Sequence, residues 1–101
     1  MEITVVGRHM DVTDPIRQHA EQKIAKLDKY QDQVIRCDVT VSREASGKEL
    51  FSAEVIFSVR NHPEIIGKAQ GQDLYALIDE AVTKAGRQLH DFKERLKLEH
   101  R

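Results

Sequence analysis

The pattern of apolar and polar positions divides the first third of the chain into two elements. Residues 2–7 are rich in β-branched side chains and predict a short strand that ends at Gly7. Apolar residues then recur at helical spacing, which predicts an amphipathic helix capped by Thr13 or Asp14, with Pro15 in its first turn. The apolar stripe of this helix consists of Ile16, Ala20, Ile24, Leu27 and Tyr30.

From Val34 the apolar period changes to two, which is typical of strands with one buried face. The side of this strand predicted to face the core consists of Ile35, Cys37, Val39 and Val41. Residues 44–48 predict a hairpin loop, and the alternation over 51–59 predicts a second long strand. Residues 61–63 (Asn-His-Pro) predict a turn, and residues 64–70 predict a shorter strand.

The last element has the longest periodic pattern, an amphipathic helix from about Asp73. Its apolar stripe consists of Leu74, Leu77, Ile78, Ala81, Val82, Ala85, Leu89, Phe92 and Leu96. Asp73 complements the positive end of the helix dipole, and the basic residues near the other end complement its negative end. Gly86 interrupts this helix at a cost of about 1 kcal/mol relative to alanine, which helix propensity alone does not explain.

The order of elements predicts an α+β fold, β-α-β-β-β-α, as a single domain over residues 1–101. The strand-helix-strand beginning favours a right-handed crossover and therefore two parallel strands, whereas short turns make the later strands antiparallel. Because the strands are apolar on one face only, both helices should pack on that face of a four-stranded mixed sheet.

Composition restricts the class of protein and its compartment. Apolar residues make up 40% of the chain and charged residues 33%, which is typical of a globular domain. No apolar run approaches the roughly 20 residues that span a bilayer, so we expect no membrane association. The N-terminus lacks the pattern of a signal peptide, and the lone Cys37 has no internal partner for a disulfide. Together these features predict a reducing, cytoplasmic setting.

The formal net charge of -1 does not by itself indicate a nucleic-acid binder, so RNA binding would require segregated charge. Stepping about 100° per residue places His19, Lys23, Lys26 and Lys29 on one flank of the first helix. In the last helix, Lys84, Arg87, Gln88 and Arg95 share one flank, and Asp91 interrupts that row. Such rows can follow RNA phosphates. A basic helix end is also common without any ligand, so charge alone leaves both interpretations open.

The residues that carry chemistry do not form a recognisable site. The five histidines lack metal-binding spacing, and Cys37 lies on the apolar side of a strand, where a thiol is usually inert. No carboxylate pair stands in an acid/base arrangement, and Gly67 and Gly71 do not form a phosphate-binding loop. We therefore predict a binding domain with no catalytic residues, metal, cofactor or small-molecule substrate.

Four segments, in this order, resemble one known family: residues 7–13 (GRHMDVT), 23–30 (KIAKLDKY), 71–79 (GQDLYALID), and 84–89 with 93–97 (KAGRQL and KERLK). The whole chain thereby resembles the ribosome hibernation-promoting factor family, also called ribosome-associated inhibitor, protein Y or sigma-54 modulation protein. The resemblance implies a fold related to double-stranded-RNA-binding domains. It also implies binding to the small ribosomal subunit in the decoding channel, which blocks translation in stationary phase or stress.

By position, the resemblance implies contacts with ribosomal RNA from a set of basic and polar side chains. The set consists of Lys23, Lys26, Lys29, Lys84, Arg87, Gln88, Lys93, Arg95 and Lys97, with Arg8 and His9 as further candidates. Asp91 departs from the pattern, because members often carry a basic residue there. Tyr75 could stack on a base, but a packed tyrosine with a hydrogen-bonded hydroxyl is the favoured interpretation.

Three questions stay open at the level of sequence. The alternative function is a protein-interaction or dimerising module without RNA binding, and weak self-association is compatible with either function. The family has short members and long members with a second, dimerising domain, and residues 1–101 fit a short member or the N-terminal domain of a long one. The residues do not distinguish pairing of ribosomes from silencing of single ribosomes.

Overall fold

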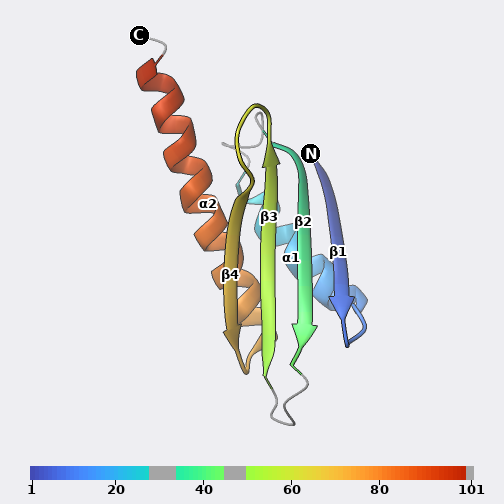
Figure 1. Ribbon diagram of the computed structural model, residues 1–101. Coiled ribbons are helices and arrows are strands. Elements are labelled where there is room, and N and C mark those ends of the chain that lie inside the picture. Colours follow the sequence, from blue (N-terminus) through green and yellow to red (C-terminus); the bar gives the residue numbers. More distant parts are fainter. Residues whose placement is uncertain (28–33, 45–49, 100–101) are drawn as a thin grey trace.

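The computed structural model describes residues 1–27, 34–44 and 50–99, with side chains as far as Leu96. The elements are β1 (Glu2–Arg8), α1 (Asp14–Ala25), β2 (Val34–Arg43), β3 (Phe51–Val59), β4 (Ile65–Gly71) and α2 (Leu74–Glu99). The sheet has the order β1-β2-β3-β4, with β1 parallel to β2 and the other pairs antiparallel. Both helices lie on one face of it, so the predicted α+β architecture is confirmed (Figure 1).

The core lies between the helices and the inner face of the sheet. Alternate residues of β2 and β3 point inward, and Val39, Val55 and Phe57 are completely buried. From α2, the predicted stripe is buried from Leu74 to Leu89, whereas Phe92 and Leu96 are only partly covered. No polar or charged residue is buried within the described ranges. The fold therefore rests on apolar packing, and the polar side chains remain at the surface.

One predicted core position is wrong. Ile35 was expected to face the helices, yet its side chain is 55% exposed, whereas the adjacent Val34 is buried. The pairing of β2 with β3 shifts register between Val34 and Arg36. Because an irregularity of this kind inserts one extra residue in a strand, Ile35 and Arg36 are both exposed, and the alternation is broken between Ile35 and Cys37. Counting in twos with Cys37, Val39 and Val41 therefore mispredicted the direction of Ile35.

Helix α1 begins as predicted and ends early. The hydroxyl of Thr13 accepts a hydrogen bond from the backbone N–H of Ile16 at 3.4 Å, which caps the helix. The helix ends at Ala25, although its apolar stripe continues to Leu27. Leu27 still packs against the core from the following turn. Tyr30, the last member of the predicted stripe, lies outside the described residues.

Two glycines set the distance between α2 and its neighbours. A Cβ atom at Gly67 of β4 would lie 2.2 Å from the carbonyl oxygen of Ala81 and 2.7 Å from the backbone nitrogen of Ala85. A Cβ atom at Gly86 would lie 3.2 Å from Cδ2 of Leu27. Gly67 therefore lets the backbones of β4 and α2 meet. Gly86, which the sequence left unexplained, makes room for the chain that follows α1.

We predict that these two glycines respond differently to alanine. Gly67→Ala must push helix backbone away from the sheet, so it should lower the free energy of unfolding by about 3 kcal/mol or more. Gly86→Ala meets only the end of a flexible leucine and gains about 1 kcal/mol of helix propensity, so its net effect should stay within about 1 kcal/mol. Urea unfolding followed by circular dichroism measures both. Equal losses would show that the close approach at Gly67 is not a tight constraint.

Cys37 is an inert core residue. Its side chain is completely buried on the inner face of β2. Burial, with a smaller effect from the neighbouring Asp38 carboxylate, raises the pKa of the thiol from 9.0 to about 12. The thiolate that would be needed for nucleophilic or redox chemistry is therefore scarce at neutral pH.

The raised pKa of Cys37 predicts slow thiol chemistry and a loss of stability in alkali. The thiolate fraction at pH 8 should be about a thousandfold below that of an unfolded chain, so a disulfide reagent should react only after denaturant is added. Since the folded pKa is the higher one, this contribution to stability is complete below pH 9.0 and is lost as the pH rises towards 12. Cys37→Ala should flatten the alkaline slope of unfolding free energy, and an unchanged slope would contradict the assignment.

Neither helix, within the described ranges, is long and apolar enough to cross a membrane. In the same ranges, no group of three or more histidine, cysteine, aspartate or glutamate side chains is arranged to hold a metal ion.

Candidate nucleic-acid interface

The end of α1 and the middle of α2 enclose a groove of about 410 Å³. We call it the interhelical groove. It brings together three of the predicted RNA-binding cations, Lys23 and Lys26 from α1 and its C-cap, and Arg87 from α2. These residues are about sixty positions apart in sequence, and they meet because both helices pack on the same face of the sheet.

The floor of the interhelical groove is apolar. It consists of Leu27, Val82 and Gly86, of which Val82 and Gly86 are buried. Gly86 contributes backbone in place of a side chain, so α2 is flat where it faces the groove. Sequence reasoning assigned Leu27 and Val82 to the core stripe and did not predict their second role. That role depends on how the two helices cross, which the periodicity of a single helix does not report.

The rim of the groove is charged and unpaired. The side chains of Lys23, Lys26 and Arg87 make no ion pair or hydrogen bond with any residue that the structure describes. Asp91 is the only carboxylate among the described residues that line the groove, and it too has no such partner there. Thr83 and His90 complete the lining. Because neighbouring side chains do not neutralise the charges of Lys23, Lys26 and Arg87, these three cations are available to an anionic ligand.

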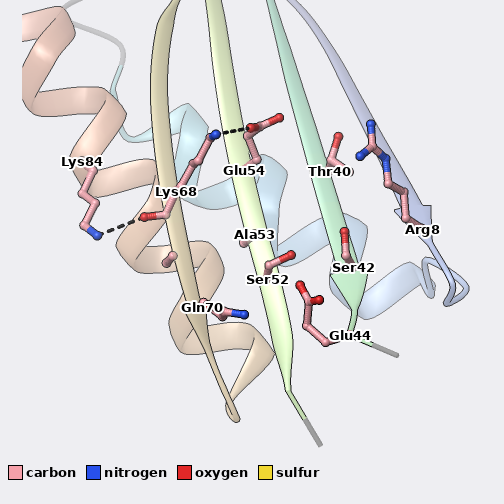
Figure 2. A pocket seen from close by; sticks show the side chains of 11 residues that line it. Arg8, Thr40, Ser42, Glu44, Ser52, Ala53, Glu54, Lys68, Gln70 and Lys84 are labelled. Carbon is pink, nitrogen blue, oxygen red and sulfur yellow. Dashed lines mark hydrogen bonds and ion pairs between the residues drawn. The ribbon is translucent and has the colours of Figure 1, made fainter. Parts of the chain in front are cut away.

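Next to Arg87 on α2, Lys84 and Gln88 face β4 and are engaged with the sheet. The ammonium group of Lys84 donates a hydrogen bond to the carbonyl oxygen of Lys68 at 3.0 Å, as Figure 2 shows. One turn later, the amide Nε2 of Gln88 donates to the carbonyl of Ile66 at 2.7 Å. Lys84 also lies 3.7 Å from Glu80. The side chains of Lys84 and Gln88, both predicted to contact RNA, therefore donate hydrogen bonds to carbonyl groups on the outer edge of β4.

The remaining predicted residues of α2 are distributed along its second half. Arg95 lines a smaller hollow of about 170 Å³ beside the β3–β4 turn, together with His62 and Phe92. The rings of His62 and Phe92 lie 4.2 Å apart and fasten that turn to the helix. Lys93 is half-buried and has an interaction within the fold. Lys97 belongs to the helix, and its side chain lies outside the described part of the structure.

Arg8 and His9 lie apart from the interhelical groove. His9 adopts a left-handed backbone conformation (φ 59°) in the turn after β1 and is exposed. Arg8 ends β1 and lines a hollow of about 460 Å³ on the open face of the sheet, drawn in Figure 2. Lys29, the remaining predicted contact, lies outside the described residues.

The open-face hollow carries mixed charge and suits phosphate less well. Glu44 and Glu54 line it alongside Arg8 and Lys68 (Figure 2). The ammonium group of Lys68 lies 3.4 Å from a carboxylate oxygen of Glu54, so this cation is already paired. Of these three hollows, the interhelical groove therefore has the strongest excess of free positive charge.

A contact between the helices holds the groove in shape. Nε2 of His19 on α1 lies 2.7 Å from Oδ1 of Asp79 on α2. The ring of Tyr75 meets the His19 ring edge-on, with 5.0 Å between centroids. Tyr75 contacts this ring but is 41% exposed, so it is not the packed tyrosine that the sequence favoured. Sequence reasoning grouped His19 with the basic flank of α1, and the structure assigns it to fixing one helix against the other.

Comparison with known proteins identifies the family. The model of the family described as "Sigma 54 modulation protein / S30EA ribosomal protein" matches residues 3–97. The chain belongs to this family. The resemblance inferred from four segments is confirmed.

Relatives and solved structures agree with this membership. "Ribosome hibernation promoting factor" of Escherichia coli (strain K12) is 33% identical over 97 residues, covering 96% of this chain and 98% of that protein. "Ribosome hibernation promotion factor" of Deinococcus radiodurans is 38% identical over 93 residues, covering 88% of this chain and 47% of that protein.

Among solved structures, the Thermus thermophilus Protein Y N-terminal domain superposes with a TM-score of 0.78 at 32% identity, covering 91% of this chain and 99% of that chain. A ribosomal subunit interface protein from Coxiella burnetii superposes with a TM-score of 0.83 at 19% identity, covering 93% of this chain and 99% of that one. The comparison with the Coxiella burnetii protein shows that the two chains share the fold although only 19% of the aligned residues are identical.

We predict that Lys84 and Gln88 contribute modestly to stability. Replacing both with alanine removes two partly exposed hydrogen bonds to β4 and should lower the unfolding free energy by about 1 kcal/mol, because water can replace the lost donors. Glu80→Gln, which removes only the 3.7 Å ion pair with Lys84, should change it by less than about 0.5 kcal/mol. Chemical denaturation measures both, and a stability equal to wild type in the double variant would contradict the tethering role.

Proposed function

We propose that this protein is a ribosome hibernation factor that binds the small ribosomal subunit in its decoding channel and inhibits translation during stress or stationary phase. Family membership over residues 3–97, and relatives named for ribosome hibernation, support the ribosome as partner. The observation that carries the RNA contact is the interhelical groove, where three unpaired cations meet. The site of action in this proposal is the cytoplasm.

In this proposal, the groove lets a chain with a net charge of -1 bind RNA. Binding to phosphates depends on local charge, because each neutralised phosphate releases counterions. Most acidic side chains of the described residues lie elsewhere, and several are paired, as in the contacts of Asp79 and Glu54. Three phosphate contacts along a single strand should give a slope of log affinity against log salt of about -2.

The inhibition that we propose is physical occlusion. The fold is an elongated body of 53 × 23 × 19 Å with an apolar core and no buried polar residue among those described. A body that is bound in the channel takes up the space of messenger and transfer RNA, and this effect requires no bond to be made or broken. In this proposal, residues 1–101 act as one ribosome-binding domain.

We predict that charge reversal in the groove abolishes binding. Lys26→Glu with Arg87→Glu should weaken co-sedimentation with small ribosomal subunits by at least about a hundredfold at near-physiological salt, because both attractions become repulsions. Both side chains are exposed and unpaired, so the circular dichroism spectrum should not change.

The matched control reverses the same number of charges elsewhere. Arg17 and Arg43 are exposed and do not line the groove. Arg17→Glu with Arg43→Glu should leave most binding intact, which separates a local site from net charge. Equal losses in both double variants would contradict the groove as the binding surface. Binding that resists high salt and ribonuclease would instead indicate a protein partner.

A further inference from the structure

Phosphate binding alone does not explain the interhelical groove. A surface that only follows a phosphate chain needs cations, yet this groove has a floor of Leu27, Val82 and Gly86 below its charged rim. Its volume of about 410 Å³ lies within the range of sites for small organic molecules, roughly 300–1,000 Å³. The combination of an apolar floor and a cationic rim suits a ligand that is both aromatic and anionic.

A nucleotide has these two properties. The face of a base can lie on aliphatic side chains and on the bare backbone at Gly86, while its phosphate meets Lys23 and Lys26 at the rim. The guanidinium group of Arg87 can donate to phosphate or lie over the base, as arginine does with aromatic faces. Single-stranded RNA commonly exposes bases in this way, and stacking contributes to its affinity.

Asp91 indicates which base would be bound. An unpaired carboxylate on the rim repels phosphate, so it weakens a site for the RNA backbone alone. A carboxylate is an acceptor with two oxygens, and it pairs best with two adjacent N–H donors. Among the four bases, guanine alone presents two such donors on its Watson–Crick edge, N1–H and the exocyclic amino group.

We propose that the interhelical groove is a subsite for one unpaired guanine, whose Watson–Crick edge donates to Asp91 while its phosphates meet Lys23, Lys26 and Arg87. This proposal rests on the proposed RNA-binding function and adds a base preference to it. Asp91, which interrupts the basic row of α2, is the residue that determines this preference.

The test measures affinity for short labelled RNAs by fluorescence anisotropy. The probes are a uridine hexamer and three versions in which one central uridine is replaced by guanosine, adenosine or inosine. The protein should bind the guanosine hexamer about tenfold more tightly than the uridine and adenosine hexamers, as for a good paired contact with a base edge. Inosine lacks the exocyclic amino group and should fall between guanosine and uridine.

The variant Asp91→Asn carries the decisive comparison. Its amide retains one acceptor and adds a donor that opposes N1–H, so the preference for guanosine should disappear while affinity for the uridine hexamer rises. Glu94→Gln makes the same change of charge on α2 at a position that does not line the groove, and it should retain the preference. If Asp91 acts only by repulsion, Asp91→Asn will strengthen every hexamer by the same factor, and the proposal is overturned.

Co-sedimentation with small ribosomal subunits separates this proposal from the proposed function. Wild-type protein that pellets with subunits but binds all four hexamers equally overturns the guanine subsite and leaves ribosome binding intact. A guanosine preference without ribosome binding overturns the proposed function and leaves the subsite. Absence of both the guanosine preference and co-sedimentation overturns the guanine subsite and the proposed function together.

Discussion

The structure depends on the close approach of α2 to β4 at Gly67. Without a side chain at this position, the backbone of the strand meets the backbone of the helix near Ala81 and Ala85. This contact brings the apolar stripe of α2 down on β3 and β4 and sets the height of the helix above the sheet. The position of Arg87 relative to Lys23 follows from that height, since α1 packs on the same face. The position of the candidate site therefore depends on a small residue inside the fold.

Much of the architecture could be predicted from the sequence because burial repeats along the chain with the period of each element. The alternation in β3 and the stripe of α2 report locally which side faces the core, and both predictions were confirmed. Ile35 shows the limit of this reasoning. Its direction depends on an irregular pairing between β2 and β3, and the partner strand is not visible in the pattern of β2 alone.

The candidate site could be predicted only in part, for a similar reason. Helical angles placed Lys84, Arg87 and Gln88 on one flank of α2, but they could not show what lies opposite each side chain. The structure divides that flank: Arg87 faces the groove, while Lys84 and Gln88 reach carbonyl groups of β4. The significance of Gly86 also appears only when Leu27 is placed beside it. The properties of the groove come from contacts of this kind, between segments that are far apart in the sequence.

The hydrogen bonds from Lys84 and Gln88 to β4 also affect how molecules of this protein meet one another. The outer edge of a sheet offers unpaired backbone groups to any passing strand, and natural proteins protect such edges to avoid aggregation. Here two side chains of α2 occupy acceptors of that edge at Ile66 and Lys68. The same helix that contributes Arg87 to the groove thus makes β4 a poorer template for strand addition by another molecule.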